Sequence, residues 1–157
     1  MNARRYMLAL LPMLLCLSAN AAAEPVKIAR SVPFESPTTA TEAVKNECGL
    51  PEQLPTWIEK AAGERVQLVD GAPSGGTTLK MKITHVLGVG GPFTPKSMSV
   101  DGELVENGKL VGSFHARRHT SGGPTCAALA KCAKSLGKDI AGFLAAPAMD
   151  AKLGDAR

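Results

Sequence analysis

The clearest pattern along the chain is the alternation of apolar and polar residues over 77–88. Leu79, Met81 and Ile83 point to one side of an extended chain, and the polar residues between them point to the other. This period of two predicts a strand with one buried face. Shorter stretches of the same kind predict strands over 25–32 and 65–70.

A hairpin follows, with strands over 96–105 and 109–118 on either side of Glu106-Asn107-Gly108. A two-residue Asn107-Gly108 loop mixes apolar and polar residues on both faces. A three-residue loop with Gly108 in the left-handed position collects the apolar residues on one face. Because a slip of one residue would turn that set toward water, the sequence predicts the three-residue loop. The predicted pairs are Leu104 with Leu110, Gly102 with Gly112, Val100 with Phe114, and Met98 with Ala116.

Helical spacing appears in three further segments. The first, over 34–48, has a capping box beginning at Thr39 and a glycine after its end, and the second, over 54–63, has Pro55 at its first position. The third is a long amphipathic helix over 125–147. The elements follow the order strand, two helices, four strands, long helix. This order predicts an α+β two-layer sandwich, in which helices cover one face of a mainly antiparallel sheet of about five strands.

The chain begins with a segment typical of export. An apolar run over 7–17 follows two arginines and is too short to span a bilayer, and small residues ending in Ala21 or Ala23 fit a cleavage site. Leu15 stands where a lipoprotein signal has a small residue before its cysteine, here Cys16. We therefore expect a signal peptide over 1–23, one α+β domain over 24–147 and a loosely held tail over 148–157.

Export changes the charge and the compartment that we expect. Loss of Arg4 and Arg5 lowers the formal net charge from +4 to +2. So small a charge argues against nucleic acid as a partner. We expect a periplasmic protein that has no membrane span once the signal peptide is cleaved.

The cysteines beyond that segment are Cys48, Cys126 and Cys132, and an oxidising compartment favours one bridge among them. Cys126 and Cys132 lie in one predicted helix, about 9 Å apart along its axis, whereas a disulfide tolerates Cα atoms about 7 Å apart at most. Cys48 ends the first predicted helix and Cys126 begins the last, so antiparallel packing of these helices brings the two together. The sequence predicts Cys48–Cys126, with Cys48–Cys132 as the alternative.

Three polar residues of the predicted hairpin have the residue types of a hydrolase triad. Ser99 is expected opposite His115, and Asp101 diagonal to it, on the face that points away from the core. The interpretation that we prefer is a solvated sheet face with cross-strand pairs. His115 and His119 are four residues apart, about 13 Å along a strand, which is too far for both to bind one metal ion. We expect no metal and no cofactor.

Arg117, Arg118 and His119 form the best local candidate for a binding site. They lie beside Ser121-Gly122-Gly123 and the start of the long helix, and helix N-termini favour anions. We interpret them as an anion-binding patch, whose partner would be an anionic envelope component or an acidic protein.

The segments "VDGELVENGKLVGSF" and "AKSLGKDIAGFLAAP" resemble those of small exported bacterial proteins without assigned function. The order of elements is similar to that of envelope accessory domains such as the curli secretion lipoprotein and the penicillin-binding-protein activator. The resemblance implies no functional residues. We therefore expect a non-catalytic periplasmic binding or accessory module that acts through a sheet edge or the 71–76 and 88–96 loops. The alternative is a hydrolase-like enzyme that uses His115 with Asp101 and Ser99.

Overall fold

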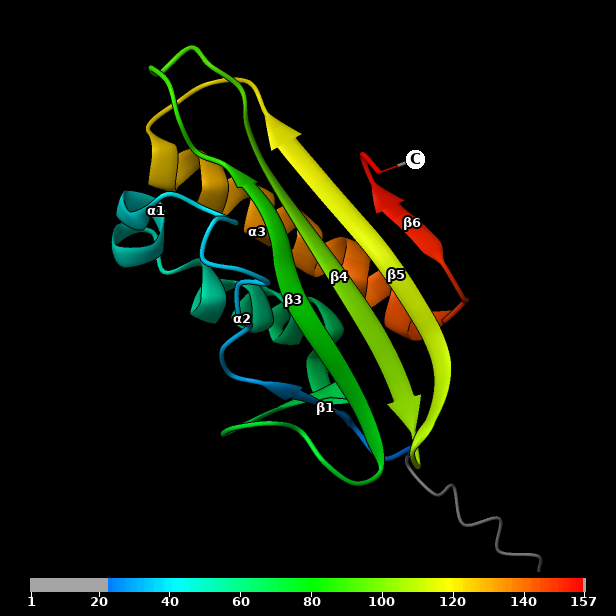
Figure 1. The fold of residues 1–157 in the computed structure, drawn as a ribbon. Coiled ribbons are helices and arrows are strands. Elements are labelled where there is room, and N and C mark those ends of the chain that lie inside the picture. The colour runs from blue at the N-terminus through cyan, green and yellow to red at the C-terminus, as the bar shows by residue number, and fades with distance from the viewer. Residues whose placement is uncertain (1–22, 157) are drawn as a thin grey trace, which may run out of the picture.

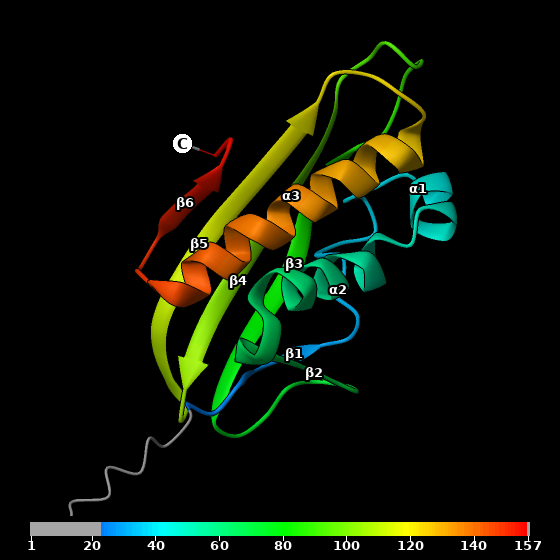
Figure 2. The same ribbon diagram turned by 180° about the vertical axis from the view of Figure 1, so that it is seen from behind.

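The computed structural model describes residues 23–156, so the predicted signal peptide lies almost wholly outside the described residues. The described part has two layers: Figure 1 looks onto the strands, and Figure 2 shows α2 and α3 lying across the other face of the sheet. This is the α+β fold class that the sequence predicts. The elements are β1 (Val26–Ala29), α1 (Glu42–Glu47), α2 (Leu50–Ala62), a short 3₁₀ helix (Gly63–Arg65), β2 (Val66–Val69), β3 (Thr77–Leu87), β4 (Lys96–Glu106), β5 (Lys109–Thr120), α3 (Thr125–Ala145) and β6 (Ala151–Gly154).

Six strands form one sheet in the order β2-β1-β3-β4-β5-β6. β3, β4 and β5 pair antiparallel, whereas β1 is parallel to β2 and β3, and β6 is parallel to β5. The sixth strand lies within residues 148–157, which we expected to be loosely held. The tail is instead the outer edge of the sheet, because its backbone pairs with β5.

The core lies between the helices and one face of the sheet. The stripe of α3 that faces the sheet is fully buried at Leu129, Leu136 and Ile140. Each such side chain contributes about 1.5–3 kcal/mol on burial, which is enough for a handful of them to hold the helix on the sheet. The strands contribute Ile28, Leu79, Ile83, Met98, Val100 and Ala116 to the same core.

The turn of the β4–β5 hairpin has two residues, so the predicted three-residue loop is wrong. Glu106 pairs with Lys109, and only Asn107 and Gly108 lie between them. Their φ angles are positive, 50° and 83°, as in a type I′ turn, whose twist matches that of the flanking strands. Asparagine and glycine adopt this left-handed conformation more readily than other residues do.

A bulge beside this turn restores the apolar face that a two-residue loop alone would lose. Val105 pairs with Leu110, but Leu104 pairs with Gly112, so Val111 is an extra residue without a partner of its own. One extra residue reverses the face of every later residue in β5. The apolar set therefore faces the helices as predicted, but each partner differs from the prediction by two residues. The observed pairs are Gly102 with Phe114, Val100 with Ala116, and Met98 with Arg118.

The first helix begins two residues later than the capping box predicts. The N-cap of α1 is Thr41, whose hydroxyl accepts the Val44 N–H at 3.4 Å. Thr39 is buried in the preceding turn, where its hydroxyl accepts the Ser36 N–H. Because Thr39 already caps that turn, it is not available to cap the helix.

The second helix, in contrast, begins at Leu50 and runs through Pro55, which we expected at its first position. A proline inside a helix removes the N–H that would donate to the carbonyl four residues earlier, here that of Pro51. The Val32 N–H donates to this carbonyl at 3.0 Å. A residue outside the helix thus donates to the Pro51 carbonyl in place of the N–H that Pro55 lacks, and the helix continues.

One disulfide ties the helices together. Cys48 at the end of α1 is bonded to Cys126 in the first turn of α3, which is the pairing that the sequence predicts, and the alternative pairing with Cys132 does not occur. Cys132 is a free, buried thiol. Burial raises the pKa of this thiol to about 11, so it stays protonated at neutral pH.

Candidate functional site

The face of the sheet that points away from the helices has a row of ionisable side chains. Lys82 of β3 pairs with Asp101 of β4, which pairs with His115 of β5. His115 in turn lies opposite Lys152 of β6. Four neighbouring strands therefore each place one ionisable residue on a line across the sheet, on the face without helices. We call these four residues the open-face row.

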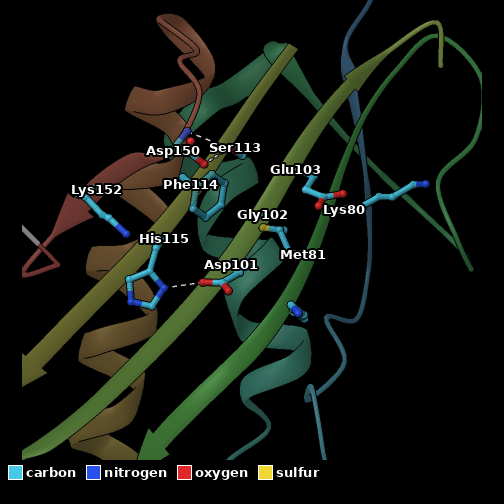
Figure 3. A pocket seen from close by; sticks show the side chains of 11 residues that line it. Lys80, Met81, Asp101, Gly102, Glu103, Ser113, Phe114, His115, Asp150 and Lys152 are labelled. Atoms are coloured by element: carbon cyan, nitrogen blue, oxygen red, sulfur yellow. Dashed lines mark hydrogen bonds and ion pairs between the residues drawn. The ribbon is translucent and has the colours of Figure 1, made fainter. Parts of the chain in front are cut away.

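A groove of about 500 Å³ lies over this row. Figure 3 shows the side chains of His115 and Asp101 turned toward each other, with Lys152 and Glu103 on either side of them. Basic and acidic groups occur in equal number along the groove, so it has no single sign of charge. The charged residues that line it are Lys80, Lys82, Lys152, Asp101, Glu103 and Asp150.

Asp101 and His115 are bonded to each other and remain accessible to solvent. Asp101 Oδ1 lies 2.5 Å from His115 Nδ1, and the two side chains are 39% and 38% exposed. Lys82 donates to Glu35 Oε1 at 2.5 Å, and this bond is the main cause that raises the pKa of its ammonium group. The row thus presents a permanent cation beside an imidazole–carboxylate pair.

Ser99 does not lie opposite His115, as we expected, because the pairing of β4 with β5 differs by two residues. Its neighbours across the sheet are Arg117 on β5 and His85 on β3. Ser99 is 4% exposed, and no hydrogen bond joins it to His115 in residues 23–156. Ser99, Asp101 and His115 share a face of the sheet, but they do not form the hydrogen-bonded chain of a triad in this structure.

Carboxylates hold two of the three residues of the predicted anion-binding patch. Arg118 donates to both oxygens of Asp139, at 2.7 and 2.8 Å, and to Asp155 at 3.2 Å. His119 Nδ1 lies 2.7 Å from Asp155 Oδ2. Arg117 is exposed and has no ion pair among residues 23–156. Of the three, Arg117 alone keeps its charge available, and anion binding here stays a prediction.

Asp155 fastens the end of β6, and its pKa gives this contact a pH dependence. Its carboxylate accepts the His119 backbone N–H at 2.9 Å, and this bond is the main cause that lowers its pKa. A carboxylate with a lowered pKa in the folded state contributes stability above its unfolded pKa of about 3.9, and this contribution disappears as the pH falls through the folded value.

We therefore expect β6 to detach from β5 in acid while the central strands remain folded. Hydrogen-exchange protection of the 151–154 amides should fall as the pH is lowered from about 6 to about 3, whereas that of the β4 amides should persist. The Asp155→Asn variant should show the weaker β6 protection already at the higher pH. Equal protection of β6 in the variant and the wild type at both pH values would show that the carboxylate does not hold the strand.

The loop between β3 and β4, one of the two loops that we expected to bind a partner, is held by Lys96. The Lys96 side chain is fully buried, and its ammonium group donates to the carbonyls of Val89 and Gly91 at 3.2 and 3.1 Å and to the Thr94 hydroxyl at 2.6 Å. A buried ammonium ion needs such acceptors. Held in this way, the loop presents Phe93 to solvent, 94% exposed.

We expect Lys96→Met to loosen the β3–β4 loop and leave the sheet folded. Methionine fills similar space but donates no hydrogen bond, so the loop carbonyls turn to water. Each lost bond is worth about 1 kcal/mol, and amide exchange in the loop should therefore become about ten-fold faster or more. The matched control is Lys45→Met, which removes a lysine bonded to the Pro37 carbonyl in another loop. Unchanged exchange in the β3–β4 loop would refute this role of Lys96.

The second expected binding loop, 71–76, borders a hollow of about 420 Å³ between β1 and β3. Its lining is mostly apolar and includes Val32, Pro33 and Leu79. The Arg30–Asp70 ion pair, 2.9 Å long, lies at its rim. Besides this ion pair, only Lys80 adds a charge to the lining, so the hollow is less charged than the groove over the open-face row.

The sequence identifies two members of the open-face row and misses the other two. A signal for Lys82 was present, because it lies on the polar side of the strand "LKMKITH", next to the polar side of the following strand. No signal identified Lys152, because a loose tail was expected where β6 forms.

No set of three or more histidine, cysteine, aspartate or glutamate residues within 23–156 is arranged to hold a metal ion. No helix in this described part of the chain has the length and apolar character to cross a membrane.

Comparisons with known proteins establish the fold and no more. No protein-family model matches the sequence, and neither does any curated protein. The chain is similar to PelC from Paraburkholderia phytofirmans, determined as a dodecamer, with 16% identity over 78% of this chain and 86% of that one and a TM-score of 0.51. It is also similar to an uncharacterised protein, with 14% identity over 77% of this chain and 92% of that one and a TM-score of 0.56. At such identities the likeness says nothing about function.

Proposed function

We propose that the protein is a non-catalytic binding or accessory module of the bacterial envelope, exported to the periplasm, and that its partner binds the open-face row and its groove. The main support for this proposal is the open-face row, which places one ionisable residue on each of four neighbouring strands. The row lies on a rigid sheet and stays accessible, which suits recognition of another surface.

The mixed charge of the groove favours a protein partner over a simple anion. Three lysines and three carboxylates line it, so a uniformly anionic ligand would meet repulsion as well as attraction. A protein surface with its own pattern of both signs can match each group, and such matching provides specificity and a faster encounter. The bond between Asp101 and His115 fixes the positions of two of these groups before binding.

Affinity capture from envelope extract tests this proposal when it is done with matched variants. The binding variant Lys82→Gln/Asp101→Asn/Lys152→Gln removes three charges of the open-face row. The control Lys131→Gln/Lys134→Gln/Lys138→Gln removes three charges on the opposite side of the molecule, on the exposed part of α3. We expect one envelope protein to bind the wild type and the control and to be lost from the binding variant. Equal capture by both variants would exclude the open face as the binding site.

A hydrolase-like activity is the second candidate function, because Asp101 and His115 form the acid–base half of a triad. The position of Ser99 argues against it, since Arg117 and not His115 lies opposite that serine. The serine that lies on the same strand and face as His115 is Ser113, and its hydroxyl is bonded to Asp150 at 3.2 Å. An enzyme of this kind would have to rearrange before its nucleophile met the base.

The Ser99→Ala variant separates the two functions. We expect it to change neither partner capture nor hydrolysis of a panel of ester and amide substrates, and to alter the free energy of unfolding by no more than about 1 kcal/mol. His115→Ala, in contrast, should weaken capture, because it removes the partner of Asp101. Hydrolysis by the wild type that is lost in both variants would establish the enzyme instead.

A further inference from the structure

The outer face of the helix layer has three lysines along the middle of α3. Lys131, Lys134 and Lys138 are exposed and lie on the side of α3 that faces away from the sheet. Figure 2 looks onto this side, where α3 and α2 lie next to each other. Asp139 is the only acidic residue in α3, and both of its oxygens are bonded to Arg118. No carboxylate of α3 therefore offsets the three lysines.

Trp57 of α2 continues this surface across the groove between the two helices. The Lys60 ammonium lies 4.7 Å from the centre of its ring, and the Lys134 ammonium lies 5.1 Å from it. The Cβ and backbone atoms of Trp57 lie against Gly137, where a Cβ atom would come within 2.7–3.0 Å of them. The close approach of the two helices thus places one lysine from each helix near the same aromatic ring. We call Trp57, Lys60, Lys131, Lys134 and Lys138 the basic helix face.

The charges of the basic helix face have no carboxylate partner within the described fold. None of its four lysines takes part in an ion pair within residues 23–156, whereas Lys27, Lys45 and Lys82 elsewhere each have a carboxylate within 4 Å. Like charges at neighbouring helix positions repel one another and weaken the helix slightly. Their position therefore fits an external anion better than it fits stability.

The shape of the basic helix face indicates what kind of anion this is. Both hollows described above lie elsewhere, one on the open face of the sheet and one beside β1. Lys60 and Lys134 meet at the Trp57 ring, whereas Lys131 and Lys138 lie one helical turn to either side of Lys134 along α3. Because the charge is spread along the helix in this way, it suits an extended anionic plane. Lysine with an amphipathic indole ring is a combination suited to the boundary between phospholipid headgroups and acyl chains.

We propose that the basic helix face docks the protein on an anionic phospholipid surface, with the lysines on lipid phosphates and Trp57 at the headgroup boundary. The open-face row, on the opposite side of the sheet, then points away from the membrane. The two faces act independently, so this docking does not rest on the function proposed above.

Vesicle binding tests the docking, and the fluorescence of Trp57 reports on it because the chain has one tryptophan. The probe is vesicles of equal parts phosphatidylglycerol and phosphatidylcholine, with pure phosphatidylcholine as the neutral comparison. We expect sedimentation with the anionic vesicles alone, a blue shift of the tryptophan emission, and loss of both in high salt. Each lysine near an anionic surface contributes about five-fold in affinity, so Lys131→Gln/Lys134→Gln/Lys138→Gln should bind more than about 100-fold more weakly.

The matched control is Lys80→Gln/Lys82→Gln/Lys152→Gln, which removes the same charge from the open face. Every variant has the same N-terminal segment as the wild type, so that segment cannot account for a difference between them. The control should bind the vesicles as the wild type does. Equal weakening in both variants would show attraction by net charge alone and would overturn the proposal. Binding to soluble polyglutamate or dextran sulfate but not to the anionic vesicles would overturn it as well, in favour of an anionic polymer.

Discussion

Replacement of both bridged cysteines, in Cys48→Ser/Cys126→Ser, is expected to lower the free energy of unfolding by about 4.5 kcal/mol. The bridge joins residues 78 apart in the sequence, and a closed loop of that length restricts the unfolded chain strongly. The folded state also depends on it locally. α1 has six residues, too few for a stable isolated helix, and the bridge fixes its end to α3.

Urea denaturation of the wild type, the double serine variant and Cys132→Ala measures this effect. Cys132→Ala keeps the bridge and removes the free thiol, so it should lose much less stability than the serine variant. The serine variant should also give faster amide exchange in α1 than in α2. If the wild type has the same free energy of unfolding with and without a reducing agent, the bridge contributes nothing to stability.

Phe114→Ala is the second substitution with a large expected effect, a loss of about 3–5 kcal/mol of unfolding free energy. The ring is 4% exposed and packs edge-on against Phe143, with 4.9 Å between the ring centres. It also covers Gly102, its partner on β4, so closely that a Cβ atom there would lie 2.3 Å from the ring. An aromatic residue over a glycine in this way helps to fix the register of the two strands.

A double-mutant cycle checks the contact between Phe114 and Gly102. Gly102→Ala alone should destabilise the protein, because its methyl group collides with the ring. In the Phe114→Ala background the same methyl group meets open space, so Gly102→Ala should then have little effect or a stabilising one. Denaturation curves of the four proteins give the coupling. Additivity to within about 0.5 kcal/mol would mean that the ring does not lie over the glycine.

This register matters for the site because Phe114 is the residue before His115. The two side chains point to opposite faces, so the contact that places Phe114 over Gly102 also places His115 opposite Asp101. A shift by one residue would move the imidazole to the helix face. A shift by two would keep the face but separate the pair.

The alternation of residues in β4 and β5 was enough to predict which side chains point at the helices, but not which residues are partners. The side of the sheet to which a side chain points depends only on whether its position along the strand is odd or even. A register that is wrong by two residues therefore leaves that side unchanged. The bulge at Val111 and the two-residue turn were not predictable because each is favourable only with the other. For the same reason the sequence placed Ser99, and not Asp101, opposite His115.

Other features depend on contacts between residues far apart in the sequence. The passage of α2 through Pro55 relies on the Val32 N–H, which no local rule supplies. β6 has only four residues, too few for a clear alternation of apolar and polar positions. Contacts that involve side chains fasten it at both ends, from Asp150 to Ser113 and from Asp155 to Arg118. The Cys48–Cys126 bridge, in contrast, was predictable, because helix geometry excluded the neighbouring pair and left the helix ends to meet.

Photo-crosslinking in living cells tests most directly whether a partner binds the open-face row. A photoreactive amino acid placed at Lys152 or Lys82 lies on the open face, and one placed at Lys134 lies on the opposite side of the molecule. We expect a crosslink from both open-face positions to the same envelope protein, and no crosslink to that protein from position 134. A partner crosslinked from position 134 alone would contradict this expectation.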